Sequence, residues 1–252
     1  MLRSNSRIIF ILVEPIYAGN IGAIARILNN FCFTELRIVG CIPKKNDYYL
    51  AMHSEHLIDN ALLFPDLAAA VSDLDRVIAF SRRLGKNKPI DMSPMQMASY
   101  VHELPQLKIG LVFGRETFGL TDEEADLCPL RCHFSANPEF PSINLAQAVA
   151  LATYEIASYE QRNHEQGGQL KVDAVSGEEL DKIYQYMIEV MSGIGYFKDH
   201  ETTNWEVFLK KLLAQLNPNK ETVYRLRQMF NRFHVLVKGR GKGYDQHDRS
   251  GV

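Results

Sequence analysis

The sequence predicts an α/β protein built on a parallel sheet, followed by a small all-helical domain. Short β-branched runs alternate with helical stretches over residues 1–162, a pattern typical of a parallel sheet. A polar segment containing Gly167-Gly168 then interrupts the pattern, and apolar residues recur at helical spacing beyond it. With 252 residues, of which 46% are hydrophobic and 23% charged, the chain is long enough for two such domains.

Five short apolar runs are predicted to be strands, at residues 8–13, 36–39, 77–80, 109–113 and 132–135. The first run could be mistaken for the core of a signal peptide. It is short, it ends in Glu14-Pro15, and no small-residue cleavage site follows, so a buried strand explains it better. No run is long enough to span a bilayer.

Two longer helices are predicted in the α/β part. Residues 21–30 follow the first strand, and residues 144 to about 161 carry apolar side chains on one helical face, at Leu145, Val149, Ala152 and Ile156. Both segments lie directly after loops that contain candidate site residues.

A second set of helices is predicted after a change in composition. Ser176 and Glu179 have the spacing of a capping box and predict a helix start. Further helices are predicted at residues 204–216 and after Asn219, whose side chain can cap the third. We therefore expect an α/β domain at residues 1–162, a linker at 163–175, a helical domain at 176–238 and a disordered tail at 239–252.

The cysteines favour a reducing compartment. Cys32, Cys41, Cys128 and Cys132 lie in a chain long enough to fold without disulfides, which indicates the cytoplasm. Cys128 and Cys132 lack a second ligand pair at a recognised metal-site spacing, so no metal is expected.

Charge is distributed unevenly along the chain. The net charge is -2, yet from Trp205 onward 10 positive and 4 negative residues give +6, so the preceding residues carry -8. A basic end suggests a polyanionic partner such as nucleic acid, although a basic surface is often only a solvated face.

The first candidate site segment follows the first strand and reads Asn20-Ile-Gly22-Ala-Ile-Ala-Arg26. Small residues at a strand-to-helix turn let the backbone approach a ligand closely. Arg26 is a cation within an otherwise apolar run. The competing interpretation is an arginine on the exposed stripe of an amphipathic helix.

The second segment, Phe113-Gly114-Arg115-Glu116-Thr117-Phe118-Gly119-Leu120, follows the strand at residues 109–113. Ligands of open α/β sheets bind beyond the carboxyl ends of strands, where this segment lies. Its two glycines permit close backbone contact and Glu116 offers a carboxylate, although a lone Gly-x-Glu turn is more often only a turn.

The third segment, Asn137-Pro-Glu-Phe-Pro-Ser142-Ile143-Asn144-Leu145, again lies between a strand and a helix. Ser142 or Asn144 could be an ordinary helix N-cap. The functional interpretation is that the loop encloses an adenine with its backbone and apolar side chains.

Together the three segments resemble the SpoU branch of the SPOUT RNA methyltransferases. That family's pattern is Asn-x-Gly-x-x-x-Arg, then Phe-Gly-x-Glu-x-x-Gly-Leu, then a Pro-containing loop that ends in Ser-Leu-Asn; this chain has Ser142-Ile143-Asn144, a conservative departure. Within the family the chain is most similar to the TrmJ group of tRNA (cytidine/uridine-2′-O-)-methyltransferases. Asn137-Pro-Glu-Phe140 and the segment from Leu226 to Arg232 carry that closer resemblance.

The resemblance implies a SPOUT-type parallel sheet with a C-terminal trefoil knot, and a homodimer in which Arg26 of one subunit meets a cofactor held by the other. Knots are rare exceptions among protein folds, and periodicity does not reveal them. The implied cofactor is S-adenosyl-L-methionine, bound in a bent shape by the loops of the knot. By position, its pocket is expected to be lined by Phe80, Ser81, Arg82, Gly114, Phe134, Pro141, Ser142 and Ile143.

The implied reaction is methylation of a ribose 2′-hydroxyl. A 2′-hydroxyl is barely ionised near pH 7, so a site must stabilise charge on the attacking oxygen. Arg26 matches the catalytic arginine of the family. Arginine stays protonated in proteins, so we expect it to hold the ribose and phosphate rather than act as a base. Asn20, Glu116, Ser142 and Asn144 are expected to orient Arg26, the loops and the substrate.

RNA, with tRNA as the first candidate, is the implied partner. Besides Arg26, basic residues of the helical domain are expected to contact its backbone: Lys210, Lys211, Arg225, Arg227 and Arg232. An anticodon-loop C or U is the expected target, with rRNA as the alternative substrate. Six aromatics could stack on bases, although most are expected in the helical core: Tyr184, Tyr186, Tyr196, Phe197, Trp205 and Phe208.

Other functions stay open at this point. A catalytically silent RNA-binding relative is disfavoured by the intact Asn20, Arg26, Glu116 and Asn144. An α/β enzyme acting on a small molecule with a nucleotide cofactor is disfavoured because the first loop lacks Gly-x-Gly-x-x-Gly and a phosphate-loop lysine. Methylation of a base instead of a ribose is a further alternative.

Overall fold

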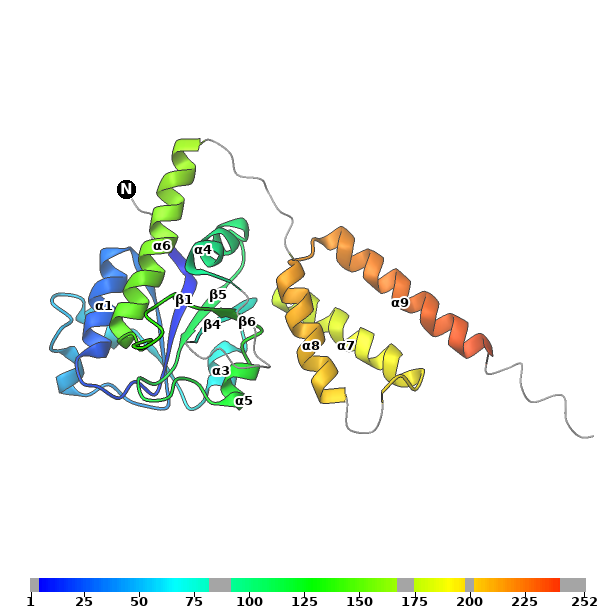
Figure 1. Cartoon of the computed structure of the whole chain (residues 1–252), viewed down its shortest axis with the longest axis horizontal. Helices are drawn as coiled ribbons and strands as arrows, with labels where there is room; N and C mark the ends of the chain where they lie inside the picture. The colour runs from blue at the N-terminus through cyan, green and yellow to red at the C-terminus, as the bar shows by residue number, and fades with distance from the viewer. Residues whose placement is uncertain (1–4, 82–91, 167–174, 198–201, 241–252) are drawn as a thin grey trace, which may run out of the picture. The chain divides into compact units, whose positions relative to one another are not determined.

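The computed structural model describes residues 5–81, 92–166, 175–197 and 202–240 (Figure 1). The chain divides into two compact units, Met1–Val172 and Asp173–Val252. Among the helices in these ranges, none is long and apolar enough to cross a membrane.

The first unit contains a six-stranded sheet in the order β3-β2-β1-β5-β4-β6, and every strand pair is parallel. Its strands are β1 (Asn5–Val13), β2 (Phe33–Val39), β3 (Leu62–Phe64), β4 (Arg76–Phe80), β5 (Ile109–Phe113) and β6 (Leu130–Cys132). The chain extends the sheet from β1 toward β3 and later adds β5 on the other side of β1. The carboxyl ends of β1, β5 and β4 therefore lie next to one another, at the place where open α/β sheets bind ligands.

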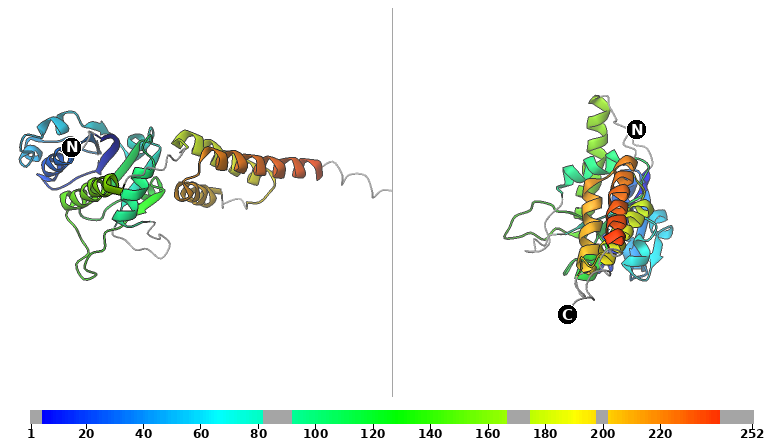
Figure 2. Two further views of the ribbon diagram at one scale, coloured as in Figure 1. Left: turned by 90° about the horizontal axis from the view of Figure 1, so that it is seen from above. Right: turned by 90° about the vertical axis from the view of Figure 1, so that its right-hand side faces the viewer.

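Helices cover the sheet and confirm the predicted α/β class. They are α1 (Asn20–Asn30), the 3₁₀ helix η1 (Lys45–Tyr48), α2 (Glu55–Asp59), α3 (Leu67–Val71), α4 (Pro94–Glu103), α5 (Asp122–Asp126) and α6 (Leu145–Gln166). α6 packs against α1 and α4 (Figure 2). Alternate residues of β1, such as Ile9 and Ile11, pack instead with Leu67 and Ala70 of α3. Because both faces of β1 are buried, residues 8–13 form an unbroken apolar run.

Several elements of the first unit differ from the sequence prediction, which also did not include η1, α2, α3, α4 and α5. β6 is Leu130–Cys132, so the strand predicted at residues 132–135 is wrong beyond its first residue. The chain leaves the sheet after Cys132, and the Phe134 ring stacks on Phe80. The short strand β3 was not predicted, because Leu62 and Leu63 are half exposed on the sheet edge.

α6 also differs from the prediction, since it continues to Gln166. Residues 163–166, expected in the linker, are therefore helical.

The second unit is a bundle of α7 (Gly177–Gly193), α8 (Thr202–Leu216) and α9 (Lys220–Arg240), in which α7 contacts both other helices. The capping box at Ser176 and Glu179 is confirmed, with Ser176 Oγ accepting from Glu179 N at 3.2 Å. Asn219 Oδ1 caps α9 by accepting from Thr222 N at 2.9 Å, also as predicted. The bundle's core includes Leu180, Ile183, Met187, Leu209, Leu213 and Phe230.

Two boundaries of this unit differ from expectation. Val175, expected in the linker, is buried in the bundle core. α9 runs to Arg240, so residues 239–240 are helical, while residues 241–252 of the expected tail lie outside the described residues. Of the six aromatics, Tyr184 is buried in the core and Tyr186, Phe197 and Trp205 pack against it, as expected of most of them.

Candidate active site

A pocket lies at the carboxyl ends of the central strands. Most of its lining comes from three chain segments: the end of β4 with Ser81, the hairpin that follows β5 over residues 114–120, and the loop between β6 and α6. Residues of α5 and of the first turn of α6 also line it. Seven of the eight residues expected to hold a cofactor line this pocket: Phe80, Ser81, Gly114, Phe134, Pro141, Ser142 and Ile143. The eighth, Arg82, lies outside the described residues.

Aromatic rings form one wall of the pocket. Phe80 stacks on Phe113, with ring centroids 4.4 Å apart, and on Phe134 at 5.3 Å. Phe113 is the buried last residue of β5, so the sheet fixes one end of this stack. Two hydrogen bonds join the loops behind it: Ser81 N donates to Cys132 O at 3.1 Å, and His133 Nδ1 lies 2.9 Å from Ser81 O. The result is a flat apolar surface at the strand ends.

The hairpin at residues 114–120 needs glycine at both of its ends. Arg115 N donates to Gly119 O at 3.1 Å, and Gly119 N donates back to Arg115 O at 2.9 Å. A Cβ on Gly114 would lie 2.4 Å from the Gly119 carbonyl carbon and 2.5 Å from Leu120 N, and Gly119 has a φ of 79°. Only glycine allows this close approach and this left-handed backbone without strain.

The Glu116 carboxylate connects this hairpin to the loop between β1 and α1. Its Oε2 accepts from Ile16 N at 2.9 Å, and its Oε1 accepts from Tyr17 N at 3.2 Å and from Asn20 Nδ2 at 2.6 Å. Asn20 Oδ1 in turn accepts from Asn144 Nδ2 at 3.2 Å. The structure therefore brings together three of the five residues expected to be catalytic, each from a different segment.

Asn144 has two roles in the structure. Its Oδ1 accepts from Ala146 N at 2.9 Å and from Gln147 N at 3.3 Å, so it caps α6. Its Nδ2 is left to donate to Asn20. Asn144 can therefore cap α6 and also belong to the polar network, because its side-chain oxygen and nitrogen bond to different partners.

Arg26 and Ser142 are the other two residues expected to be catalytic. Ser142 is exposed on the rim of the pocket. Arg26 is exposed on α1 and, within the described residues, makes no hydrogen bond or ion pair and does not line the pocket. Its helix is fixed in place by Gly22, where a Cβ would lie 2.5 Å from Asp47 O of η1. A single chain therefore does not bring Arg26 to its own pocket.

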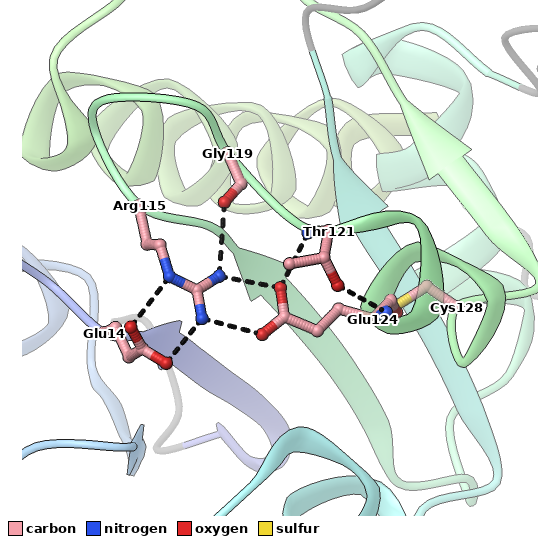
Figure 3. Close-up of polar contacts among 6 residues, drawn as sticks. All are labelled: Glu14, Arg115, Gly119, Thr121, Glu124 and Cys128. Carbon is pink, nitrogen blue, oxygen red and sulfur yellow. Dashed lines mark hydrogen bonds and ion pairs between the residues drawn. The ribbon is translucent and has the colours of Figure 1, made fainter.

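Sequence reasoning missed an ion-pair network centred on Arg115 (Figure 3). The buried Arg115 guanidinium pairs with Glu14 at 2.5 Å and with Glu124 at 2.7 Å. Hydrogen bonds that Arg115 donates to Glu124 and Glu14 raise the pKa of Arg115, and the bond that Glu14 accepts from Arg115 lowers the pKa of Glu14. Burial opposes ionisation of Glu124, but hydrogen bonds from Arg115 and the Thr121 amide outweigh it and lower the pKa of Glu124.

One sequence signal did point to part of this network. Thr121 and Glu124 have capping-box spacing, and both of its hydrogen bonds form at the start of α5. The sequence does not indicate that Glu124 contacts Arg115, because the capping box explains Glu124 without an ion pair.

The five basic residues predicted to contact RNA lie on α8 and α9 of the second unit. Lys210 is 4.7 Å from the Tyr184 ring, and the Arg227 guanidinium is 5.8 Å from the Tyr186 ring. Arg225 pairs with Glu221 at 2.6 Å. Arg232 is exposed and Lys211 half-buried. Among the described residues of both units, no group of three or more His, Cys, Asp or Glu could hold a metal ion.

The known proteins to which this chain is similar are RNA methyltransferases. Residues 7–154 match the SpoU rRNA Methylase family. The chain is 41% identical over 158 residues to tRNA (cytidine-2′-O-)-methyltransferase TrmJ of Methanocaldococcus jannaschii, covering 61% of this chain and 68% of that protein. It is 27% identical over 236 residues to tRNA (cytidine/uridine-2′-O-)-methyltransferase TrmJ of Escherichia coli K12, covering 91% and 96%.

A solved structure extends the similarity to both units. The crystal structure of TrmJ from Z. mobilis ZM4 matches with a TM-score of 0.67 at 30% identity, covering 89% of this chain and 97% of that one.

Proposed function

Because the chain belongs to the SpoU rRNA methylase family, we propose that it transfers a methyl group from S-adenosylmethionine to a ribose 2′-hydroxyl of tRNA. The target that we propose is a C or U of the anticodon loop. The observation that supports this best is the convergence of loops after β4, β5 and β6 on one pocket. The relatives named as tRNA enzymes favour tRNA, and the family's description makes rRNA the second candidate.

The pocket fits an adenosyl group. The stacked Phe80 and Phe134 rings offer an apolar surface, and Pro141 and Ile143 add to it. Gly114 lets the hairpin backbone close tightly on Gly119 and Leu120 beside the pocket. We propose that these residues hold S-adenosylmethionine, which supplies a methyl group already activated by its sulfonium.

The remaining task of the protein is to present a ribose oxygen. Glu116 and Asn20 hold the β1–α1 loop through the hydrogen bonds described above. In our proposal Arg26, at the second turn of α1, binds the ribose and its phosphate and stabilises charge on the attacking oxygen. Since arginine stays protonated, a phosphate or water accepts the proton.

We also propose that a homodimer completes the site. Arg26 does not reach the pocket of its own chain, so a second subunit must supply it. Large apolar side chains are exposed on the β1–α1 loop and on α6: Ile16 is 53% exposed, Tyr17 56%, Leu151 43% and Tyr154 58%. Because α1 packs against α6, these residues can form one interface that also carries Arg26.

We propose that the second unit binds the tRNA backbone through Lys210, Lys211, Arg225, Arg227 and Arg232. A trefoil knot in the first unit and a cytoplasmic location are part of the same proposal. The four cysteines, which form no disulfide, support a reducing compartment.

The test uses purified protein, S-adenosylmethionine labelled in its methyl group, and bulk tRNA or rRNA in parallel. We expect label in tRNA, mapped by mass spectrometry to a C or U of the anticodon loop. Label in rRNA alone would replace the tRNA proposal by the second candidate. No transfer to either RNA would contradict the proposed activity.

A further inference from the structure

We propose that Arg115 is a positioning residue. Its pairs with Glu14 and Glu124 fix the hairpin at residues 114–120 and the β1–α1 loop relative to each other. The inference rests on the proposed function of the pocket, which the hairpin lines. It assigns separate tasks to the two carboxylates. Glu124 fixes the position of the hairpin through its pair with Arg115. Glu14, also paired with Arg115, couples the loop before α1 to the hairpin.

The Arg115 guanidinium uses all of its donors within the protein. Nε and Nη2 donate to the two oxygens of Glu14 at 2.9 and 2.5 Å. Nη1 and Nη2 donate to the two oxygens of Glu124 at 2.7 and 2.9 Å, and Nη1 also approaches Gly119 O at 3.5 Å. An arginine fork has five N–H groups, so none remains for a substrate. A direct catalytic contact is therefore excluded in this geometry, and a positioning role remains.

The partners belong to three different segments. Glu14 follows β1 directly, Gly119 closes the hairpin, and Glu124 lies in α5. Glu124 Oε2 also accepts from Thr121 N at 2.8 Å, which joins the network to the start of α5. The side chains of Arg115 and Glu124 are 7% and 18% exposed, so water competes little for their pair, whereas the Glu14 side chain is 49% exposed.

Arg115 and its neighbour Glu116 hold opposite ends of the same loop. Arg115 binds Glu14 at the loop's first residue, whereas Glu116 binds Ile16, Tyr17 and Asn20 further along. Two consecutive residues of the pocket hairpin thus hold residues 14–20, which lead into the helix that carries Arg26. A shift of the hairpin must move this loop as well.

The backbone at Glu14 supports this assignment. Glu14 has a φ of 43°, a left-handed conformation that a residue with a side chain rarely adopts. Its amide donates to Val39 O at 2.9 Å, and its side chain fills the space beside Gly40, where a Cβ would lie 2.6 Å from Glu14 Cγ. Such a conformation persists only when surrounding contacts enforce it, and the bidentate pair with Arg115 is one of these contacts.

The test compares Glu14→Gln, Glu124→Gln and Arg115→Lys with a matched control, Glu123→Gln. Glu123 lies beside Glu124 in the first turn of α5, is exposed, and has no hydrogen bond or ion pair among the described residues. Each variant is measured for its Kd for S-adenosylhomocysteine by calorimetry, its kcat with tRNA at saturating cofactor, and the hydrogen exchange of residues 14–20.

We expect substitutions of the two carboxylates to affect different measurements. Glu124→Gln should raise the Kd for S-adenosylhomocysteine by about tenfold, the order expected when a charge-assisted hydrogen bond is weakened. Glu14→Gln should change this Kd by less than about twofold, lower kcat by about tenfold and speed exchange of the Ile16 and Tyr17 amides. Arg115→Lys should show both effects, because an ammonium cannot form two bidentate pairs. Glu123→Gln should match the wild type in every readout.

Two results would overturn the inference. One is that Glu14→Gln and Glu124→Gln only lower Tm, while Kd and kcat well below Tm stay within about twofold of wild type. The other is unchanged exchange of the Ile16 and Tyr17 amides in Glu14→Gln. The exchange experiment needs neither cofactor nor RNA, so its outcome is independent of the proposed function. Absence of methyl transfer by the wild-type protein would instead contradict the proposed function.

Discussion

Asn20 and Asn144 lie 124 residues apart in the chain, and the amide of Asn144 donates to the amide oxygen of Asn20 at 3.2 Å. This bond joins the start of α1 to the start of α6. Since Asn20 also donates to Glu116, three loops of the candidate site share one polar network. The contact allows capping and catalysis to be tested separately at one residue.

Two substitutions at Asn144 should give different results. Asn144→Asp keeps the oxygen that caps α6 but loses the donor to Asn20, so Tm should change little while kcat falls by at least about tenfold. Asn144→Ala loses the cap as well and should cost about 1 kcal/mol of unfolding free energy, measured in urea. Normal turnover by Asn144→Asp would contradict a role of this bond in catalysis.

Arg26→Ala should abolish methyl transfer while leaving the affinity for S-adenosylhomocysteine nearly unchanged. The reason is that Arg26 does not line the pocket of its own chain. Calorimetry and a labelled-methyl assay measure the two properties independently. Normal turnover would show that the role assigned to Arg26 is wrong.

Mixing subunits tests the shared site. Neither Arg26→Ala nor Gly114→Val should be active alone, but a mixed dimer contains one intact pocket facing one intact Arg26. Co-expression with two different tags allows that species to be isolated. Activity in the mixed dimer supports a site built from both subunits, and its absence, with both variants folded and dimeric, would contradict one.

Gly114→Ala should weaken cofactor binding. A methyl group there meets the Gly119 and Leu120 backbone at 2.4–2.5 Å, so the hairpin must open. Gly193→Ala is the matched control, because a Cβ at Gly193 meets nothing within 4 Å. Calorimetry with S-adenosylhomocysteine should show a raised Kd for the first variant and a wild-type Kd for the second; equal values would contradict the tight-hairpin argument.

Acid stability should depend on Glu124. Its pKa is lowered in the folded protein from the ordinary value of 4.5, so its contribution is present above that pH and is lost as pH falls toward the folded-state pKa. Between pH 7 and pH 3, the Tm of the wild type should therefore fall more than that of Glu124→Gln. Parallel Tm curves would show that this ion pair does not contribute to stability.

Much of the fold was predictable because the signals are long and local. β1 and α1 follow from an unbroken apolar run and a helical pattern, each carried by neighbouring residues. β3 and β6 are three residues long and carry almost no periodicity, which explains why β3 was missed and β6 misplaced.

The site was predictable only where motifs mark it. Family motifs identified Glu116, Asn20 and Asn144, which the structure joins by hydrogen bonds. The Arg115 network was not predictable, because Glu14 lies 101 residues from Arg115 and in the sequence only marks the end of a strand. Long-range pairs of charged residues leave no local pattern.

The position of the transferred methyl group tests the proposed activity most directly. tRNA treated with the protein and labelled S-adenosylmethionine is hydrolysed with alkali, which cleaves every linkage whose 2′-oxygen is free. If the protein methylates the ribose 2′-oxygen, the label stays in alkali-resistant dinucleotides. Label released in single methylated nucleotides would place the methyl on a base and contradict the proposed activity.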